Sequence, residues 1–157
     1  YEASRAGVKV LLNVRGICCL RPGLKGASDK IRVVSIIDRY LEHARIFWFR
    51  QGGQPQVFIA SADFMTRNLS KRVELLTPVE DATARQRLEG ILRTIFADNI
   101  QARILNSDGT YTPVKFERSA KPLRSQQFFA SEAAKRAKSR TPSPDVLIPH
   151  TPKEGVS

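Results

Sequence analysis

The stretch VKVLLNV, residues 8–14, constrains the fold more than any other part of the chain. It is almost entirely apolar, and Gly7 and Gly16 stand on either side of it. A continuous apolar run is typical of a strand that is covered on both faces, as in the sheet of an α/β protein. Residues 1–7 resemble the end of a helix that leads into this strand, and they begin with Tyr1. We therefore expect an α/β domain cut from a longer protein.

The segment 28–61 predicts one helix and one hairpin. Ser28 is a plausible N-cap for residues 29–42, where Ile31, Val34, Ile36 or Ile37, and Leu41 recur at helical spacing. The aromatic and β-branched runs RIFWF (45–49) and QVFIAS (56–61) surround a Gly-Gly pair. Such a pair between two strand-like runs predicts a β-hairpin.

The second half of the chain predicts two more helices and several short strands. The stretch 72–79 is typical of a strand, and 102–105 and 111–116 predict short strands around Asp108-Gly109. The stretch 81–99 has an acidic start and a helical apolar period, so it predicts a helix. A final helix is expected at 122–138, which gives one domain over residues 1–138.

The last segment, residues 139–157, differs in composition from the rest. It holds four prolines in 19 residues and has no periodic apolar face. Such a segment cannot bury enough apolar surface to offset its ordering entropy. We expect a disordered C-terminal tail, in which His150 has no role.

The charge of the chain favours anionic partners. It has 26 Lys and Arg against 15 Asp and Glu, a formal net charge of +11. Nucleic acid, nucleotide phosphates, polyphosphate and an anionic membrane all fit this balance. No apolar run approaches the roughly 20 residues of a membrane span, and no signal segment opens the chain. We expect a cytoplasmic protein, with peripheral membrane contact left open, and reduced thiols at Cys18 and Cys19.

Polar side chains flank the predicted strands in pairs at i and i+2, which places both members of a pair on one face. The pairs are Asn13 and Arg15, His43 and Arg45, and Ser61 and Asp63. Strand ends at one edge of an α/β sheet are where ligands bind. Arginine binds phosphate oxygens in a bidentate fork, and histidine can hand a proton to a leaving oxygen. The pattern predicts phosphoryl chemistry.

Each of these residues also has a simpler interpretation. His43 can be a capping or surface residue, and Arg15 a solvated charge at a strand end. Asp63 can satisfy free backbone amides of a turn or a helix start, and Arg67 can be solvated. The residues alone leave both interpretations open.

Four stretches together resemble one enzyme family: VRGICCLRPG, DRYLEHARIF, SADFMTRN and RVELLTPVED. They are similar, in order and over residues 1–129, to the C-terminal domain of bacterial polyphosphate kinase of the first class. That family is similar in fold to phospholipase D, so the resemblance implies a mixed sheet flanked by helices. His43-Ala44-Arg45 stands at the His-x-Lys motif and Ser61-Ala62-Asp63 at the Gly-Ser-x-Asn turn. The arginine and the aspartate depart from phospholipase D and fit the kinase branch.

The resemblance implies reversible transfer of the γ-phosphate of ATP to the end of a polyphosphate chain. In that family a phosphohistidine forms on a preceding domain, which implies that His43 faces it as acid/base or phosphate ligand. Arg15 is implied to contact nucleotide phosphates, and we expect the remaining phosphate contacts from Arg45, Ser61, Asp63 and Arg67. No metal site is expected in this chain, because Mg²⁺ would be bound mainly by other parts of the enzyme.

The expected partners are ATP or ADP, polyphosphate, the other domains of the same enzyme and further copies of it, and no nucleic acid. Two alternatives remain from the sequence. A phospholipase D-like phosphodiesterase or nuclease would need a second His-x-Lys motif, which dimerisation would supply. A basic nucleic-acid-binding module would need surface aromatic residues and a basic face, and His43 would be dispensable.

Overall fold

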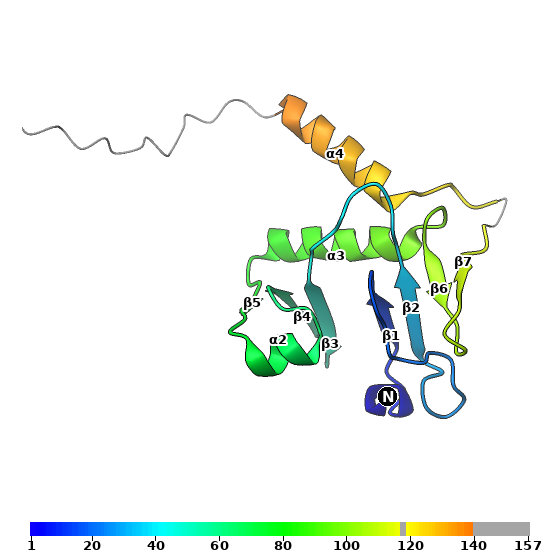
Figure 1. Ribbon diagram of the computed structural model, residues 1–157. Helices are drawn as coiled ribbons and strands as arrows, with labels where there is room; N and C mark the ends of the chain where they lie inside the picture. The colour runs from blue at the N-terminus through cyan, green and yellow to red at the C-terminus, as the bar shows by residue number, and fades with distance from the viewer. Residues whose placement is uncertain (117–118, 140–157) are drawn as a thin grey trace, which may run out of the picture.

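The computed structural model describes residues 1–116 and 119–139 (Figure 1). The helices are α1 (Glu2–Arg5), α2 (Thr66–Lys71), α3 (Ala82–Ala97) and α4 (Ser125–Ser139). The strands are β1 (Val10–Asn13), β2 (Ile31–Ser35), β3 (Ile46–Gln51), β4 (Gln54–Ala60), β5 (Leu76–Pro78), β6 (Arg103–Leu105) and β7 (Tyr111–Pro113). This order confirms the predicted α/β class.

The first sheet has the strand order β1-β2-β6-β7. β1 pairs in parallel with β2, whereas β2 with β6 and β6 with β7 are antiparallel, so this sheet is mixed. On one face Ile31 and Val33 of β2 pack with Leu105 and with Val10 and Leu12 of β1. On the other face Ile36 packs with Ile95 of α3.

The helix predicted at residues 29–42 is wrong. Residues 31–35 form β2, the central strand, and Val33 and Val34 are both fully buried. A central strand buries both of its faces, so neighbouring residues are buried in it although their apolar spacing also fits a helix. Ser28 caps no helix, because its hydroxyl donates to Arg21 O (2.5 Å) and accepts from Leu24 N (3.0 Å) within a turn.

The second sheet has the strand order β3-β4-β5 and is antiparallel. The predicted hairpin is confirmed, with Gly52 and Gly53 at its turn. Both glycines have positive φ (60° and 137°), which side-chain-bearing residues rarely adopt. The strand predicted at 72–79 is confirmed in the shorter form of β5.

The two long helices lie on the same side of the strands (Figure 1). Both were predicted, and α3 begins where Asp81 accepts a hydrogen bond from Ala84 N at 2.7 Å. Phe129 of α4 packs against the cluster that contains Ile95 of α3 and Ala102. The short strands predicted around Asp108-Gly109 are confirmed as β6 and β7, which pair antiparallel.

The predicted tail covers residues 139–157, and all but Ser139 lie outside the described residues. Ser139 itself is the last residue of α4. Within residues 1–116 and 119–139, no helix combines the length and the apolar character that crossing a membrane requires.

Candidate functional site

The candidate site lies where three segments meet: the residues after β1, those before β3 and those after β4. The sequence predicted that these strand ends share one sheet edge, and this is wrong. β1 belongs to the mixed sheet, whereas β3 and β4 belong to the antiparallel sheet. The polar side chains therefore come together across two sheets.

Arg45 forms the centre of the cluster. Its Nε and one terminal nitrogen donate to Asp63 Oδ1 at 3.0 and 2.8 Å. Its other terminal nitrogen donates to the carbonyl of His43 at 2.9 Å. The nitrogen bound to Asp63 also lies 3.5 Å from His43 Nδ1. Arg45 therefore connects the segment before β3 with the segment after β4.

The contact with Arg45 bears on the tautomer of His43. Guanidinium nitrogens donate hydrogen bonds and do not accept them, so Nδ1 is the acceptor in this contact. In the neutral ring the proton then lies on Nε2. The His43 side chain is exposed, so Nε2–H is the group that it offers to a ligand.

Arg15, which follows β1 of the mixed sheet, extends to the segment that carries His43. One terminal nitrogen of its half-buried side chain donates to the carbonyl of Glu42, the residue before His43. Within the part of the chain that the structure describes, Arg15 forms no salt bridge. Its guanidinium keeps donors for an anion beside His43.

The electrostatics agree with this arrangement. The Arg45 guanidinium bonded to Asp63 lowers the pKa of that carboxyl, and the nearby Arg15 lowers it further through its charge. Asp63 is therefore ionised near neutral pH and compensates one of the two guanidinium charges. The cluster keeps a net positive charge, which favours an anionic ligand.

Ser61 has a structural task in this arrangement. Its hydroxyl donates to Glu74 Oε2 at 2.5 Å and accepts from Leu75 N at 2.9 Å, which fixes the end of β4. Glu74 also accepts from Asn68 Nδ2 at 2.9 Å, and these bonds lower the pKa of its carboxyl. Glu74 was not predicted from the sequence, because no periodicity or motif marks a carboxylate that joins α2 to the end of β4.

Two expected residues do not join the cluster by a hydrogen bond or salt bridge. Arg67 is exposed on α2, and Asn13 is exposed at the end of β1. The role of Arg67 as a phosphate contact stays a prediction.

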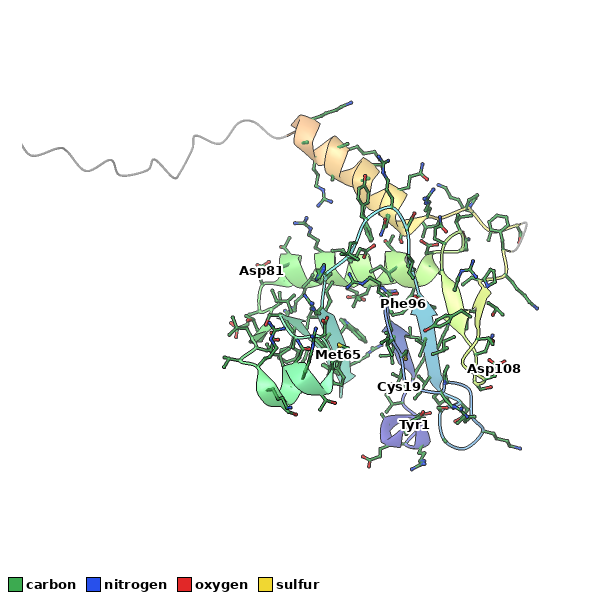
Figure 2. All side chains as sticks on the ribbon, in the orientation of Figure 1. Tyr1, Cys19, Met65, Asp81, Phe96 and Asp108 are labelled. Carbon is green, nitrogen blue, oxygen red and sulfur yellow. The ribbon has the colours of Figure 1, made fainter. Side chains whose placement is uncertain are left out.

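Neither a metal cluster nor the cysteines extend the site. Among the described residues, no three His, Cys, Asp or Glu side chains gather as a metal ion would require. Cys18 and Cys19 are free thiols. Figure 2 shows Cys19 at the same end of the molecule as Tyr1, while Asp81 marks the start of α3.

The fold and the cluster define a mixed α/β domain in which an exposed histidine and two guanidinium groups lie together. The sequence model of the family described as "Polyphosphate kinase C-terminal domain 2" matches residues 1–126. The chain belongs to the polyphosphate kinase family, through its C-terminal domain.

Individual polyphosphate kinases are similar to this chain in sequence. The polyphosphate kinase of Rhodopirellula baltica is 50% identical over 144 residues, which are 92% of this chain and 17% of that relative. The polyphosphate kinase of Synechocystis sp. is 48% identical over 146 residues, 93% of this chain and 20% of that relative. That of Thermosynechococcus vestitus is 55% identical over 111 residues, 71% of this chain and 15% of that relative.

A solved structure shows the same fold. The crystal structure of polyphosphate kinase from Porphyromonas gingivalis superposes with a TM-score of 0.81 and 41% sequence identity, covering 88% of this chain and 21% of that one. The chain thus spans about a fifth of the length of the relatives that it matches.

Proposed function

We propose that this chain forms one wall of the active site of a polyphosphate kinase, which moves the γ-phosphate of ATP reversibly to the end of a polyphosphate chain. The convergence of Arg15, His43 and Arg45 from two sheets carries the proposal. The names of the relatives, and the match of the chain to a C-terminal domain, support it. The enzyme's remaining domains would supply the histidine that becomes phosphorylated and the groups that bind Mg²⁺, and the whole enzyme would act as a homo-oligomer.

Each residue has a distinct task in this reaction. The phosphoryl group breaks its bond to the bridging oxygen of ATP and forms one to a histidine nitrogen on the opposite wall, and ADP leaves. A phosphate oxygen at the polyphosphate end then attacks the phosphohistidine and completes the transfer. Negative charge grows on the bridging oxygen, and His43 Nε2–H donates to it while Arg15 binds neighbouring phosphate oxygens. Such a reaction requires positioning and positive charge more than covalent chemistry from this wall.

Arg45 acts mainly through His43. Its bonds to Asp63 and to the His43 carbonyl engage most of its donors, so it contributes charge to the ligand and orientation to the imidazole. Asp63 in turn fixes the Arg45 fork, whose bonds to a carboxylate are stronger than those to a neutral acceptor.

His43→Ala in the complete enzyme tests the proposal. Loss of a positioned acid or base lowers kcat on the order of 10² to 10⁴-fold. Polyphosphate synthesis from ATP measures it, with circular dichroism to establish that the variant is folded. The matched control is His150→Ala, which should leave kcat unchanged. Near-normal turnover by a folded His43→Ala would refute the role of His43.

A further inference from the structure

The segment between β2 and β3, residues 36–45, carries His43 and contains no helix or strand. It rises past α3 and passes the start of α4 before it returns to β3 (Figure 1). Ile37 and Leu41 are 73% and 74% exposed, so apolar packing does not hold this part of the segment. Polar contacts from the first turn of α4 hold it instead.

Gln126 makes the closest of these contacts. Its Oε1 accepts from Tyr40 N at 2.7 Å, and its Nε2 donates to Tyr40 O at 2.8 Å. The same Nε2 donates to Glu42 Oε1 at 2.7 Å. Gln126 is only 5% exposed, so water is largely excluded from these bonds. One amide thereby fixes the backbone three residues before His43 and the side chain of the residue directly before it.

The two residues before Gln126 are themselves held by hydrogen bonds to buried carboxylates. Arg124 donates from Nε to Asp38 Oδ2 at 2.9 Å, and a second nitrogen of Arg124 donates to the other oxygen of Asp38. Ser125 N donates to the buried carboxylate of Asp98 at 2.7 Å, just after the end of α3. The first turn of α4 therefore cannot move without breaking charge-assisted hydrogen bonds.

We propose that Gln126 is a positioning residue for His43, acting through the segment 40–42. The contacts run without a break from α4 to the site: Gln126 holds Glu42, whose carbonyl accepts from Arg15, and His43 follows in the chain. The inference rests on the proposed function, because it assigns Gln126 to the placement of the acid/base of that reaction. A displacement of about 1 Å at a reacting group can cost 10²-fold in rate.

The test is Gln126→Glu in the complete enzyme, with Gln127→Glu as the matched control. The glutamate cannot donate to Tyr40 O and faces the Glu42 carboxylate, whereas Gln127 is the exposed neighbour on the same helix. We expect kcat for polyphosphate synthesis to fall roughly 10 to 100-fold in Gln126→Glu, with a much smaller change in KM for ATP. Gln127→Glu should match the wild type.

Adding Glu42→Gln to Gln126→Glu restores one of the lost contacts. In Gln126→Glu combined with Glu42→Gln, the new amide donates to the new carboxylate, so the 42–126 contact returns with donor and acceptor exchanged. We expect part of the lost kcat to return, because the bond to Tyr40 O stays broken. A stabilising role alone would instead lower the melting temperature of Gln126→Glu and leave kcat of the folded enzyme unchanged, which would overturn the inference. Equal losses in Gln126→Glu and Gln127→Glu would also overturn it.

The outcomes separate this inference from the proposed function. If His43→Ala is slow and Gln126→Glu is not, only the positioning role is refuted. If His43→Ala is fully active, the proposed function itself is refuted. Should Gln126→Glu fail to fold, Gln126→Met decides, because it keeps the length of the side chain and loses the bonds to Tyr40 and Glu42. A folded Gln126→Met with kcat roughly 10 to 100-fold below the wild type supports the inference, and a folded one with wild-type kcat overturns it.

Discussion

Replacement of Asp98 by asparagine should destabilise the domain, because this carboxylate joins two helices. Asp98 is 1% exposed. Its Oδ1 accepts from the backbone N–H groups of Ile100, Gln101 and Ala102 at 3.0, 2.8 and 3.2 Å. Its Oδ2 accepts from Ser125 N at 2.7 Å. An asparagine can keep the first three bonds but then turns its NH₂ group toward the Ser125 N–H, so a buried donor loses its acceptor.

The expected loss is about 1.5–3 kcal/mol in the free energy of unfolding, the usual worth of a hydrogen bond to a charged group. For a chain of this length it corresponds to a fall in melting temperature of roughly 2–4 °C per kcal/mol. Denaturant unfolding at pH 7 measures it. The control is Asp108→Asn, because Asp108 is exposed and accepts from Thr110 through Oδ1 alone, which asparagine retains.

The same variant has a pH signature. Burial raises the pKa of the Asp98 carboxyl, but its N–H donors, Ser125 first, lower it by more, so the folded-state pKa lies below the usual value. A lowered carboxyl pKa stabilises the fold above the unfolded pKa of about 3.9, and this contribution is lost as the pH falls through the folded value. The gap between wild type and Asp98→Asn should therefore shrink below about pH 4. A loss no larger than that of Asp108→Asn, or a gap independent of pH, would refute the reasoning.

Three further predictions concern the site. Arg15→Lys keeps the charge but loses the planar fork, so kcat/KM for ATP should fall on the order of tenfold in steady-state kinetics of the complete enzyme. An unchanged kcat/KM would remove Arg15 from the site. Ser61→Ala removes the hydroxyl between Glu74 and Leu75 and should cost about 1–2 kcal/mol in chemical denaturation while kcat changes little, whereas a large loss of kcat at unchanged stability would make Ser61 a phosphate ligand. The 157-residue chain alone should melt cooperatively and retain no label from γ-labelled ATP. Acid-labile phosphate on His43 would instead make His43 the nucleophile.

Local patterns predicted most of the elements but not the central strand. The hairpin around Gly52-Gly53 and the helix after Asp81 carry signals within a few residues of sequence. β2 lacks the alternation of a half-exposed strand, because it is buried on both faces, and its Ile and Val residues also satisfy a helical spacing. Periodicity alone cannot separate those two cases.

The residues of the site likewise fall into those that local sequence patterns predicted and those that they did not. The sequence predicted His43, Arg45, Asp63 and Arg15 because each flanks a strand. In the structure Arg45 contacts Asp63 and His43, and Arg15 bonds to the residue before His43. Gln126 was not found, because its partners lie 84 and 86 residues earlier in the chain and no local motif marks it. The arrangement of the two sheets was also beyond the sequence, since strand pairing depends on contacts between distant residues.

The division of the site between two sheets means that a ligand bound to both parts would also affect the stability of the domain. Arg15 follows a strand of the mixed sheet, while Arg45 and Asp63 flank strands of the antiparallel sheet. A polyphosphate bound to both guanidinium groups would hold the two sheets together. At a concentration of 100 Kd such a ligand adds about 2.7 kcal/mol to the free energy of unfolding. Amide hydrogen exchange should then slow most in residues 36–45, which connect the two sheets.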